Sequence, residues 1–351
     1  MQIPMRHFRQ FEIEPAAETS ANASVGDLDG DGDLDIVLAK GRHWPLHDRV
    51  LLNDGKGGFP ISKNLGGKPD RTYSAVLADL DGDGDLDVMT SNDSPDEKLV
   101  YLNDGRANFL PSGTWGDRQW NTRNAAAADL NGDGKPDVIA ANRQGASFVC
   151  LNDGRAHFDR SGWIEIPAAS ATTIVAGDFD GDGLVDLAIP HRDGGQSNIY
   201  FNNGKASFAR TIPFGPAKSV ARTAAASDLN SDGWTDLIVG DERQGAFVYL
   251  NEGKGQFGDG LPLGDKSLAP YSMAVGDMNR DGHADIVIGY VKSPGSVFFG
   301  NGKGKNFEQI RFGDGVGTVY GLALADLDAD GYLDIVTGRS EAPNAIYMNV
   351  D

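Results

Sequence analysis

The residue types most able to do chemistry stand in short aspartate-rich segments. The first is Asp27-Leu-Asp-Gly-Asp-Gly-Asp-Leu-Asp35, and related segments begin at Asp79, Asp129, Asp178, Asp228, Asp277 and Asp326. Positions 1, 5 and 9 are always Asp, position 3 is Asp or Asn, position 6 is always Gly, and position 7 varies. Side-chain oxygens at 1, 3, 5 and 9, a main-chain carbonyl at 7 and a turn-forming Gly match Ca²⁺ coordination better than the tight octahedron of Mg²⁺.

These segments predict up to seven structural calcium sites. Three or four carboxylates in one loop repel each other without a cation. In the alternative interpretation, Asp and Gly supply only turn chemistry, which does not demand the same ligand positions in every segment. The predicted ligands, loop by loop, are Asp27, Asp29, Asp31, Asp33 and Asp35; Asp79, Asp81, Asp83, Asp85 and Asp87; Asp129, Asn131, Asp133, Lys135 and Asp137; Asp178, Asp180, Asp182, Leu184 and Asp186; Asp228, Asn230, Asp232, Trp234 and Asp236; Asp277, Asn279, Asp281, His283 and Asp285; Asp326, Asp328, Asp330, Tyr332 and Asp334.

The elements that position these loops repeat with the same period. The steps between segments are 52, 50, 49, 50, 49 and 49 residues, and each unit holds four short runs rich in Val, Ile, Leu, Tyr and Phe. A Phe begins the fourth run of the first six units. Such runs, bounded by Gly, Asn and Asp, predict strands. Four strands in each of seven units predict an all-β, seven-bladed β-propeller that occupies residues 1–351 as a single domain.

The two ends of the chain are predicted to complete one blade together. The last unit ends at Asn349-Val-Asp351 without a Phe-led fourth strand, whereas residues 1–14 contain such a strand without a unit before it. Pairing the two would close the ring and protect the strand edges. A linear solenoid with capped ends is the alternative.

The aspartate loops resemble those of the FG-GAP/VCBS repeat family, the calcium-loop propellers that include the head of the integrin α-subunit. The resemblance rests on the D-x-[DN]-x-D-G-x-x-D pattern and spans the whole chain, although the family's Phe-Gly and Gly-Ala-Pro signatures are weak. It implies a seven-bladed propeller with Ca²⁺ in the hairpin between the first two strands of each blade. It does not imply one function, because such folds serve both as binding modules and as enzymes.

Composition limits the partners of the protein. The formal charge is −20, which excludes a generic nucleic-acid binder. Loop positions 1, 3, 5 and 9 hold 25 of the 51 acidic residues, so about half of the acidic residues are already explained by metal binding. No apolar run is long enough to span a bilayer. The N-terminal residues lack the apolar core of a signal peptide, but the single Cys150 and the calcium loops favour a secreted or periplasmic protein, with a cytoplasmic protein as the alternative.

Function is expected on the face opposite the aspartate loops, because its loops vary from blade to blade. Six positions before each first Asp, where the inner strand begins beside the channel, stand Ala21, Tyr73, Arg123, Thr172, Arg222, Tyr271 and Tyr320. Arg suits carboxylate or sulfate, and Trp and Tyr stack on sugars, so we expect an acidic glycan as ligand. A solvated face with ordinary surface Arg is the alternative. The predicted substrate-binding residues are Arg42, Trp44, Arg71, Trp120, Arg143, Arg192, Arg243, Tyr271, Tyr320 and Arg339.

Two functions fit this face. The first is a carbohydrate lyase that acts by β-elimination at a uronic acid, or a sugar dehydratase. The second is a non-catalytic lectin or adhesion module that binds glycan or protein on the same face. For either function we expect a monomer. One blade alone carries the insertion His43-Trp-Pro-Leu-His47, and a unique site favours the enzyme over a multivalent lectin. The predicted catalytic residues are His43, His47 or His191 as base, Tyr73 as acid, and Arg123 and Arg222 for charge neutralisation.

A glycoside hydrolase is disfavoured, because the variable face offers few carboxylates for a paired-acid mechanism. The carboxylates that keep a hydrolase open are Asp93, Asp117, Asp193, Asp241 and Glu242.

Overall fold

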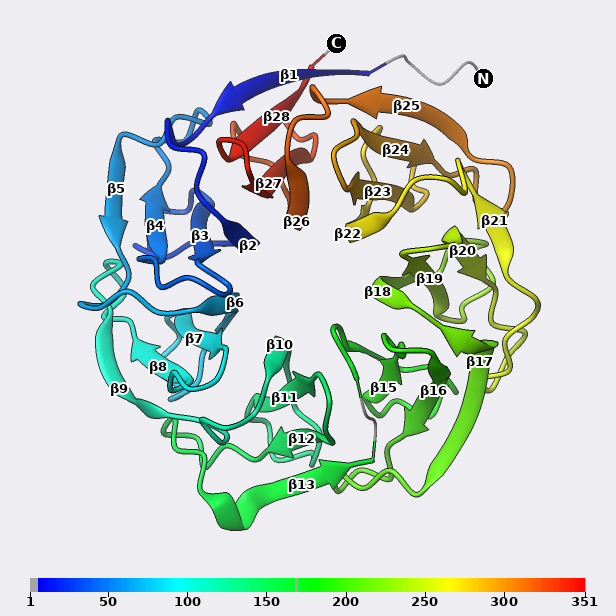
Figure 1. Ribbon diagram of the computed structural model, residues 1–351, viewed down its shortest axis with the longest axis horizontal. Helices are drawn as coiled ribbons and strands as arrows, with labels where there is room; N and C mark the ends of the chain where they lie inside the picture. Colours follow the sequence, from blue (N-terminus) through cyan, green and yellow to red (C-terminus); the bar gives the residue numbers. More distant parts are fainter. Residues whose placement is uncertain (1–5, 168–169, 351) are drawn as a thin grey trace.

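The computed structural model describes residues 6–167 and 170–350. Within these ranges the chain forms seven four-stranded antiparallel sheets, which are the blades of a ring around a central channel (Figure 1). One short 3-10 helix, η1 (Arg160–Gly162), is the only helical element in the same ranges. A helix able to cross a bilayer is absent from this part of the chain. The predicted all-β seven-bladed propeller is confirmed.

The strands of each blade follow one another from the channel to the rim. The first four blades contain β2 (Ser20–Gly26), β3 (Asp35–Lys40), β4 (Arg49–Leu52) and β5 (Ile61–Asn64); β6 (Thr72–Ala78), β7 (Asp87–Asn92), β8 (Leu99–Leu102) and β9 (Leu110–Thr114); β10 (Thr122–Ala128), β11 (Asp137–Asn142), β12 (Ser147–Cys150) and β13 (Trp163–Ile166); β14 (Val175–Gly177), β15 (Asp186–Ile189), β16 (Gly195–Phe201) and β17 (Arg210–Ser219). The next two contain β18 (Ala221–Ser227), β19 (Asp236–Asp241), β20 (Gly245–Tyr249) and β21 (Leu261–Leu263); β22 (Pro270–Gly276), β23 (Asp285–Tyr290), β24 (Gly295–Phe299) and β25 (Glu308–Phe312).

The seventh blade joins the two ends of the chain. It consists of β26 (Thr318–Ala325), β27 (Asp334–Ser340), β28 (Ala345–Val350) and, at the rim, β1 (His7–Glu12). Strand β1 pairs antiparallel with β28, with Phe8 opposite Asn349 (Figure 1). The N-terminal strand therefore closes the ring, as predicted from the missing strand of the last unit.

The hydrophobic core lies between neighbouring blades. The second strand of each blade is buried along its whole length, and its Val, Ile and Leu side chains contact both adjacent sheets. Between the last blade and the first, Ile36 and Leu38 pack with Val336 and Ile346. Because every blade buries its faces against two neighbours, the blades hold the inner strands in a fixed ring around the channel.

The outer strands begin later than the Phe residues indicate. Phe158 is buried in the core between the second and third blades, and β13 begins only at Trp163, after η1. Phe59 likewise packs between blades, two residues before β5. The Phe side chain is thus an anchor that fixes where the rim strand starts, because burying its ring takes precedence over strand pairing at that position.

Candidate functional site

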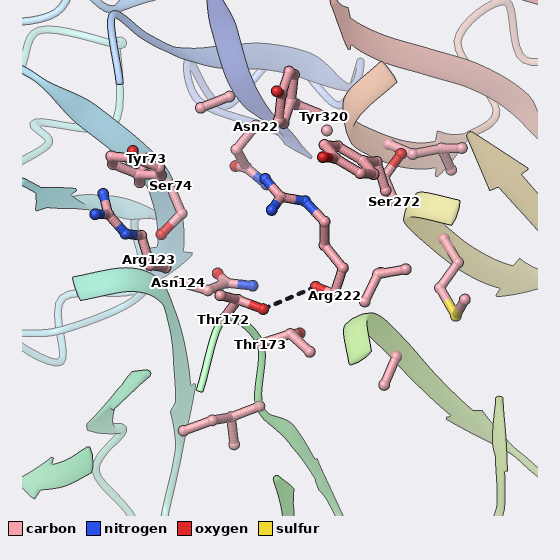
Figure 2. Close-up of a pocket in the computed structure, with 18 of the residues that line it drawn as sticks. Asn22, Tyr73, Ser74, Arg123, Asn124, Thr172, Thr173, Arg222, Ser272 and Tyr320 are labelled. Carbon is pink, nitrogen blue, oxygen red and sulfur yellow. Dashed lines mark hydrogen bonds between the residues drawn. The ribbon is translucent and has the colours of Figure 1, made fainter. Parts of the chain in front are cut away.

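A cavity of about 430 Å³ lies at the mouth of the central channel (Figure 2). The residue six positions before the first Asp of each blade lines this cavity in every blade. These residues are Ala21, Tyr73, Arg123, Thr172, Arg222, Tyr271 and Tyr320. The position six residues before the first loop Asp therefore defines one complete ring of side chains around the cavity, with one member from each blade.

A β-bulge aims these side chains into the channel. In β6, Thr72 pairs with Asn92 and Ser74 pairs with Ser91, which leaves Tyr73 without an opposite residue. The register shifts at the equivalent residue in six of the described inner strands. A bulge re-aims the side chain of the extra residue away from the sheet. In the fourth blade Thr172 lies before the start of β14, so no bulge forms there.

A second ring of polar side chains was missed in the sequence. Its members follow directly after the first ring, five positions before the loop Asp, and all line the cavity (Figure 2). They are Asn22, Ser74, Asn124, Thr173, Thr223 and Ser272. The sequence does contain a signal for this second ring. The residue five positions before the first loop Asp is polar in every blade except the last, which has Gly321 there.

Tyr73, His43, Asp93 and Arg123 form one polar network at the cavity wall. The Tyr73 hydroxyl lies 3.0 Å from Nε2 and 3.2 Å from Nδ1 of His43. A carboxylate oxygen of Asp93 lies 3.5 Å from His43 Nδ1 and 3.0 Å from a guanidinium nitrogen of Arg123. Asp93 therefore holds the imidazole and the guanidinium in place from behind, a role that was not predicted.

The surroundings set the protonation states of this pair. Burial, together with the cations Arg42 and Arg123, lowers the pKa of His43 below its usual value. Burial raises the pKa of the Tyr73 hydroxyl above its usual value. At neutral pH the imidazole is therefore a neutral base and the phenol a protonated acid.

Arginine and tyrosine side chains alternate around the mouth. Arg123 lies 4.1 Å from the centre of the Tyr73 ring, and Arg42 lies 5.5 Å from the same ring. Arg42 lies 3.7 Å from the Tyr320 ring, which Arg222 approaches at 5.5 Å. Arg222 also lies 3.8 Å over the Tyr271 ring. A cation–π contact holds the flat face of each guanidinium against an aromatic ring and uses none of its N–H groups, although Arg123 also contacts Asp93.

The cavity is locally positive in a protein of formal charge −20. Among the described residues, four Arg and one His line it, and no Asp or Glu does. Burial, and the nearby guanidinium groups of Arg192 and Arg42, lower the pKa of Arg222. Each carboxylate that kept a hydrolase open already has a partner: Asp93 with Arg123, Asp117 near Arg160, Asp193 with Arg143, Asp241 with backbone amides and Glu242 with Arg192.

Several predicted residues lie away from the cavity. His47 lines a separate hollow with Glu14, Glu18 and Lys40. His191 Nδ1 accepts hydrogen bonds from the backbone N–H groups of Asp193 and Gly195, so it organises its own loop. Trp44 is 70% exposed beside His43. Neither His47 nor His191 is placed with Tyr73.

The remaining predicted binding residues support neighbouring structure. Trp120 stacks on Phe148 with ring centres 4.3 Å apart. Arg71 pairs with Asp96 at 2.8 Å, and the buried Arg339 pairs with Asp314 at 3.0 Å. The backbone N–H of Arg243 donates to Asp241. Of the predicted binding residues, the structure brings Arg42, Arg143, Tyr271 and Tyr320 to the cavity.

The aspartate loops lie in the hairpin between the first and second strands of each blade, as predicted. The Asp at position 9 is a buried acceptor: Asp35 receives N–H groups from Leu28 (2.9 Å) and Asn53 (2.8 Å). The same pair of bonds forms in every loop. Burial raises the pKa of these carboxyls, to about 6 for Asp35 and about 7 for Asp334.

Neighbouring blades are fastened together at the same loops. Asn103, in the turn between the third and fourth strands of the second blade, donates from Nδ2 to the Leu28 carbonyl of the first blade at 2.8 Å. Asn53, Asn152, Asn202, Asn251 and Asn349 make the equivalent bond to the preceding blade. The aspartate loops and the Asn-x-Gly turns therefore share one face, opposite the cavity.

Four of the described loops present a tight group of carboxylates. Their oxygens at positions 1, 3 and 9 lie within 4.8 Å of one another. In three of them a buried oxygen at position 3 has no hydrogen-bond partner: Oδ1 of Asp29, Asp180 and Asp328. These groups fit a hard divalent cation. Such a cation would bind the oxygens that lack a hydrogen-bond partner, and it would offset the repulsion between the grouped carboxylates.

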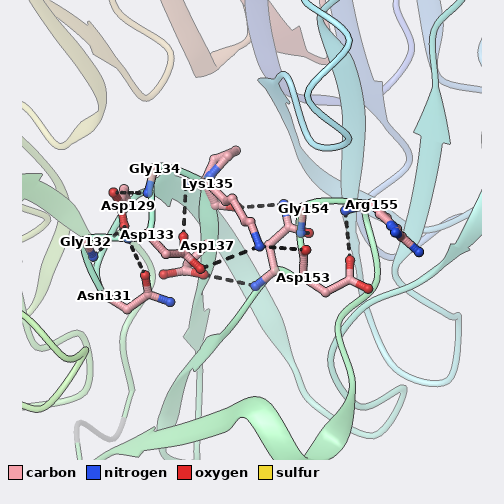
Figure 3. A network of polar contacts seen from close by, with 12 residues as sticks. Asp129, Asn131, Gly132, Asp133, Gly134, Lys135, Asp137, Asp153, Gly154 and Arg155 are labelled. Atoms are coloured by element: carbon pink, nitrogen blue, oxygen red, sulfur yellow. Dashed lines mark hydrogen bonds and ion pairs between the residues drawn. The ribbon is translucent and has the colours of Figure 1, made fainter.

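The three loops with Asn at position 3 neutralise themselves in part. The amide of Asn230 donates to Asp232 at 2.8 Å, and that of Asn279 donates to Asp281 at 3.1 Å. In the third loop the Lys135 ammonium lies 3.9 Å from Asp133 and donates to the Asp153 carbonyl (Figure 3). These three loops therefore hold a donor beside their carboxylates, and they carry one carboxylate fewer than the four-aspartate loops.

The fold and these loops define a class: a seven-bladed β-propeller whose inner hairpins carry repeated aspartate loops. The chain belongs to the family of FG-GAP-like repeat proteins, whose sequence model matches residues 27–90, 89–140, 129–189 and 228–288. No curated protein sequence matches the chain.

Solved structures share the fold at low sequence identity. A lectin of Agrocybe aegerita, described as recognising non-reducing terminal N-acetylglucosamine, is 21% identical with a TM-score of 0.63, and the match covers 95% of this chain and 86% of the lectin. BBS1N, solved in complex with ARL6DN, is 12% identical with a TM-score of 0.64 and coverage of 98% and 96%. YCF48, bound to the D1 peptide, is 8% identical with a TM-score of 0.61 and coverage of 99% and 96%. At these identities the likeness establishes the fold and not the activity.

Proposed function

We propose that the protein binds an acidic saccharide at the mouth of the channel and cleaves it by β-elimination next to a uronic acid. The observation that carries this proposal is the His43–Tyr73 pair, a neutral base in contact with a protonated acid, in a cavity that is lined by Arg and, within the described ranges, by no carboxylate. A uronate lyase needs these components: a cation for the carboxylate, a base for the adjacent proton and an acid for the leaving oxygen.

The reaction needs no water and no redox partner. The base removes the proton on the carbon next to the carboxylate, and the electron pair forms a double bond to the neighbouring carbon. The bond from that carbon to the glycosidic oxygen breaks, and the acid protonates the departing oxygen. His43 is the base and Tyr73 the acid, and Arg42 stabilises the negative charge that develops on the carboxylate during proton removal.

A non-catalytic lectin is the second candidate. The lectin of Agrocybe aegerita, which has the same fold over most of its length, favours it. The alternating Arg and Tyr side chains would serve such a lectin equally well. In this case His43 and Tyr73 would only shape the ligand pocket.

The aspartate loops hold structural Ca²⁺ in this proposal, on the face opposite the cavity. The residues at positions 1, 3, 5 and 9, with the main-chain carbonyl at position 7, are the ligands. Their role is to stabilise the hairpins that fasten the blades together. Loops of this kind suit the calcium concentration outside the cell, so we place the protein in a secreted or periplasmic setting, as a monomer.

One assay separates the two candidates. Purified protein is incubated with a panel of polyuronates and sulfated uronate-containing glycans, and the ultraviolet absorbance of the new unsaturated uronate is followed. A rise in absorbance that Tyr73→Phe abolishes supports the lyase. A flat trace together with binding to the same glycans on an array supports the lectin, and the absence of both rules out the cavity as a saccharide site.

A further inference from the structure

The arginines at the mouth divide into two groups. Arg123, Arg143 and Arg192 each have a carboxylate partner, Asp93 at 3.0 Å, Asp193 at 3.2 Å and Glu242 at 2.5 Å respectively. Among the described residues, Arg42 and Arg222 have none within ion-pair distance. The Nε of Arg42 is buried and lacks a hydrogen-bond partner.

Two cations without counter-ions in one cavity need an explanation. Burying an unpaired charge is costly, and two like charges close together add repulsion. Among the described residues, the two guanidinium groups lie against the rings of Tyr73, Tyr271 and Tyr320 and face no carboxylate, and a cation–π contact is worth less than an ion pair with fitted hydrogen bonds. The missing negative charges are therefore supplied by the ligand.

We propose that the ligand carries two anionic groups, one bound by Arg42 and the other by Arg222. This rests on the proposed function, because it names the substrate class of the same cavity. Both guanidinium groups face one ring, that of Tyr320, at 3.7 Å and 5.5 Å, so a single small ligand spans them. Arg42 is the nearer of the two to Tyr73, at 5.5 Å from its ring, and it therefore binds the carboxylate at the reacting sugar.

Arg222 then binds the anionic group of the next sugar unit. It extends across the cavity toward the first blade, against Tyr271 and Tyr320 (Figure 2). A cavity of about 430 Å³ falls within the roughly 300 to 1,000 Å³ of small-molecule sites, which suits a short segment of chain. The class of substrate is thus an oligosaccharide with an oxyanion on each of two adjacent units. The oxyanion is a carboxylate in a polyuronate and a sulfate in a sulfated uronate glycan.

Calorimetry with defined disaccharides tests this inference. Binding is measured in a Tyr73→Phe background, which keeps the ring against Arg42 and Arg123 but removes the hydroxyl, so that turnover does not interfere. The ligands are a diuronate, the two monomethyl esters that each remove one charge, the neutral diester, and a uronate–sulfated sugar dimer. The diuronate or the sulfated dimer is expected to bind about 10- to 100-fold more tightly than the monoesters, as for lost charge-assisted hydrogen bonds.

Each arginine should be coupled to one charge of the ligand. In Arg222→Gln, the diuronate is expected to lose its tighter binding relative to one of the two monoesters only. In Arg42→Gln, it is expected to lose its tighter binding relative to the other monoester only. Arg106→Gln, an exposed arginine on the opposite face, is the matched control and should bind like the parent. If Arg222→Gln lowers the melting temperature, Arg222→Lys keeps the charge and should retain selectivity for two charges.

The outcomes separate this inference from the lyase. Tight binding of doubly charged ligands with no unsaturated product overturns the elimination and leaves the two-anion site standing. Product formation with equal affinity for singly and doubly charged dimers overturns the two-anion site and leaves the lyase standing. Unchanged selectivity in Arg222→Gln also overturns the two-anion site.

Discussion

The hydroxyl of Tyr73 lies 3.0 Å from Nε2 of His43, although the two residues are thirty positions apart and belong to different blades. Their rings meet edge to face with centres 5.6 Å apart. When the phenol donates in this contact, the accepting imidazole nitrogen carries no proton, and this is the arrangement of protons that a lyase requires. A sugar bound between the two side chains would contact the base, His43, and the acid, Tyr73, at the same time.

Removing either member of this pair should abolish elimination while the fold persists. Tyr73→Phe and His43→Ala are each expected to lower kcat by about 100- to 10,000-fold, the usual contribution of a general acid or base. Initial rates of double-bond formation measure the effect, and melting curves check the fold.

Tyr332→Phe and His157→Ala are matched controls, because both residues lie on the aspartate-loop face. They should retain the parental rate. If either site variant turned over substrate as fast as these controls, the pair would have no catalytic role.

Asp93→Asn should move the pH dependence of the reaction. The Asp93 carboxylate raises the pKa of His43, against the larger lowering by burial, Arg42 and Arg123. Loss of that negative charge lowers the pKa further, so the neutral base persists to lower pH and the acidic limb of kcat/KM shifts downward by about one unit. Asp96→Asn, whose partner is Arg71, should leave the limb in place. An acidic limb displaced upward in Asp93→Asn would contradict this electrostatic account.

Chelation should destabilise the protein, and more strongly at higher pH. The position-9 carboxyls of six loops have a folded pKa of about 6 or about 7 without metal, against 3.8 unfolded, and burial also raises the pKa of the seventh, Asp137. A raised acid pKa means that the metal-free fold gains from protonation at low pH and loses that stability as pH rises through about 6 to 7. Bound Ca²⁺ replaces those protons, so the gap in melting temperature between Ca²⁺-loaded and EDTA-treated protein should widen from about pH 4 to about pH 7. Superimposable curves at the higher pH would refute the calcium assignment.

The seven loops should not bind Ca²⁺ equally. The four loops with grouped carboxylates should fill first, and the three with Asn at position 3 should bind more weakly because they carry one charge fewer and an internal donor. Asn230→Asp should convert one weak site into a tight one. Terbium luminescence excited through Trp234, at position 7 of the same loop, should then appear earlier in a titration. Asn108→Asp, in an exposed turn, is the control for added charge, and a parental titration for Asn230→Asp would show that position 3 does not set affinity.

The architecture was predictable because its signals are local and repeated. Each aspartate loop forces a hairpin at a fixed place, since its Asp side chains accept backbone N–H groups within the loop, as Asp27 does from Gly30 and Gly32. The number of repeats then gives the number of blades. The starts of the outer strands were not predictable, because the burial of Phe158 between blades depends on the neighbouring blade and not on the segment itself.

The first ring of the cavity could be predicted from its offset, but the loop residues could not. His43 reaches Tyr73 whereas His47 turns to another hollow, and no strand alternation decides between them. The path of that loop depends on Gly41, at φ 102°, where an added Cβ would lie 2.2 Å from the Trp44 carbonyl oxygen. Such contacts arise only in the folded chain, and the role of Asp93 behind His43 has the same origin.

The ring of side chains around the cavity takes one member from every blade, from Ala21 to Tyr320, and the blade that supplies the last member is closed by β1 pairing with β28. These two strands are among the most distant pairings in the chain, and pairings of that kind form late in folding. A nascent polypeptide that has emerged only as far as β25 lacks Tyr320, the ring against which Arg42 lies, so its cavity is incomplete even where the early blades have formed. We therefore expect the proposed ligand to bind only after the ring has closed.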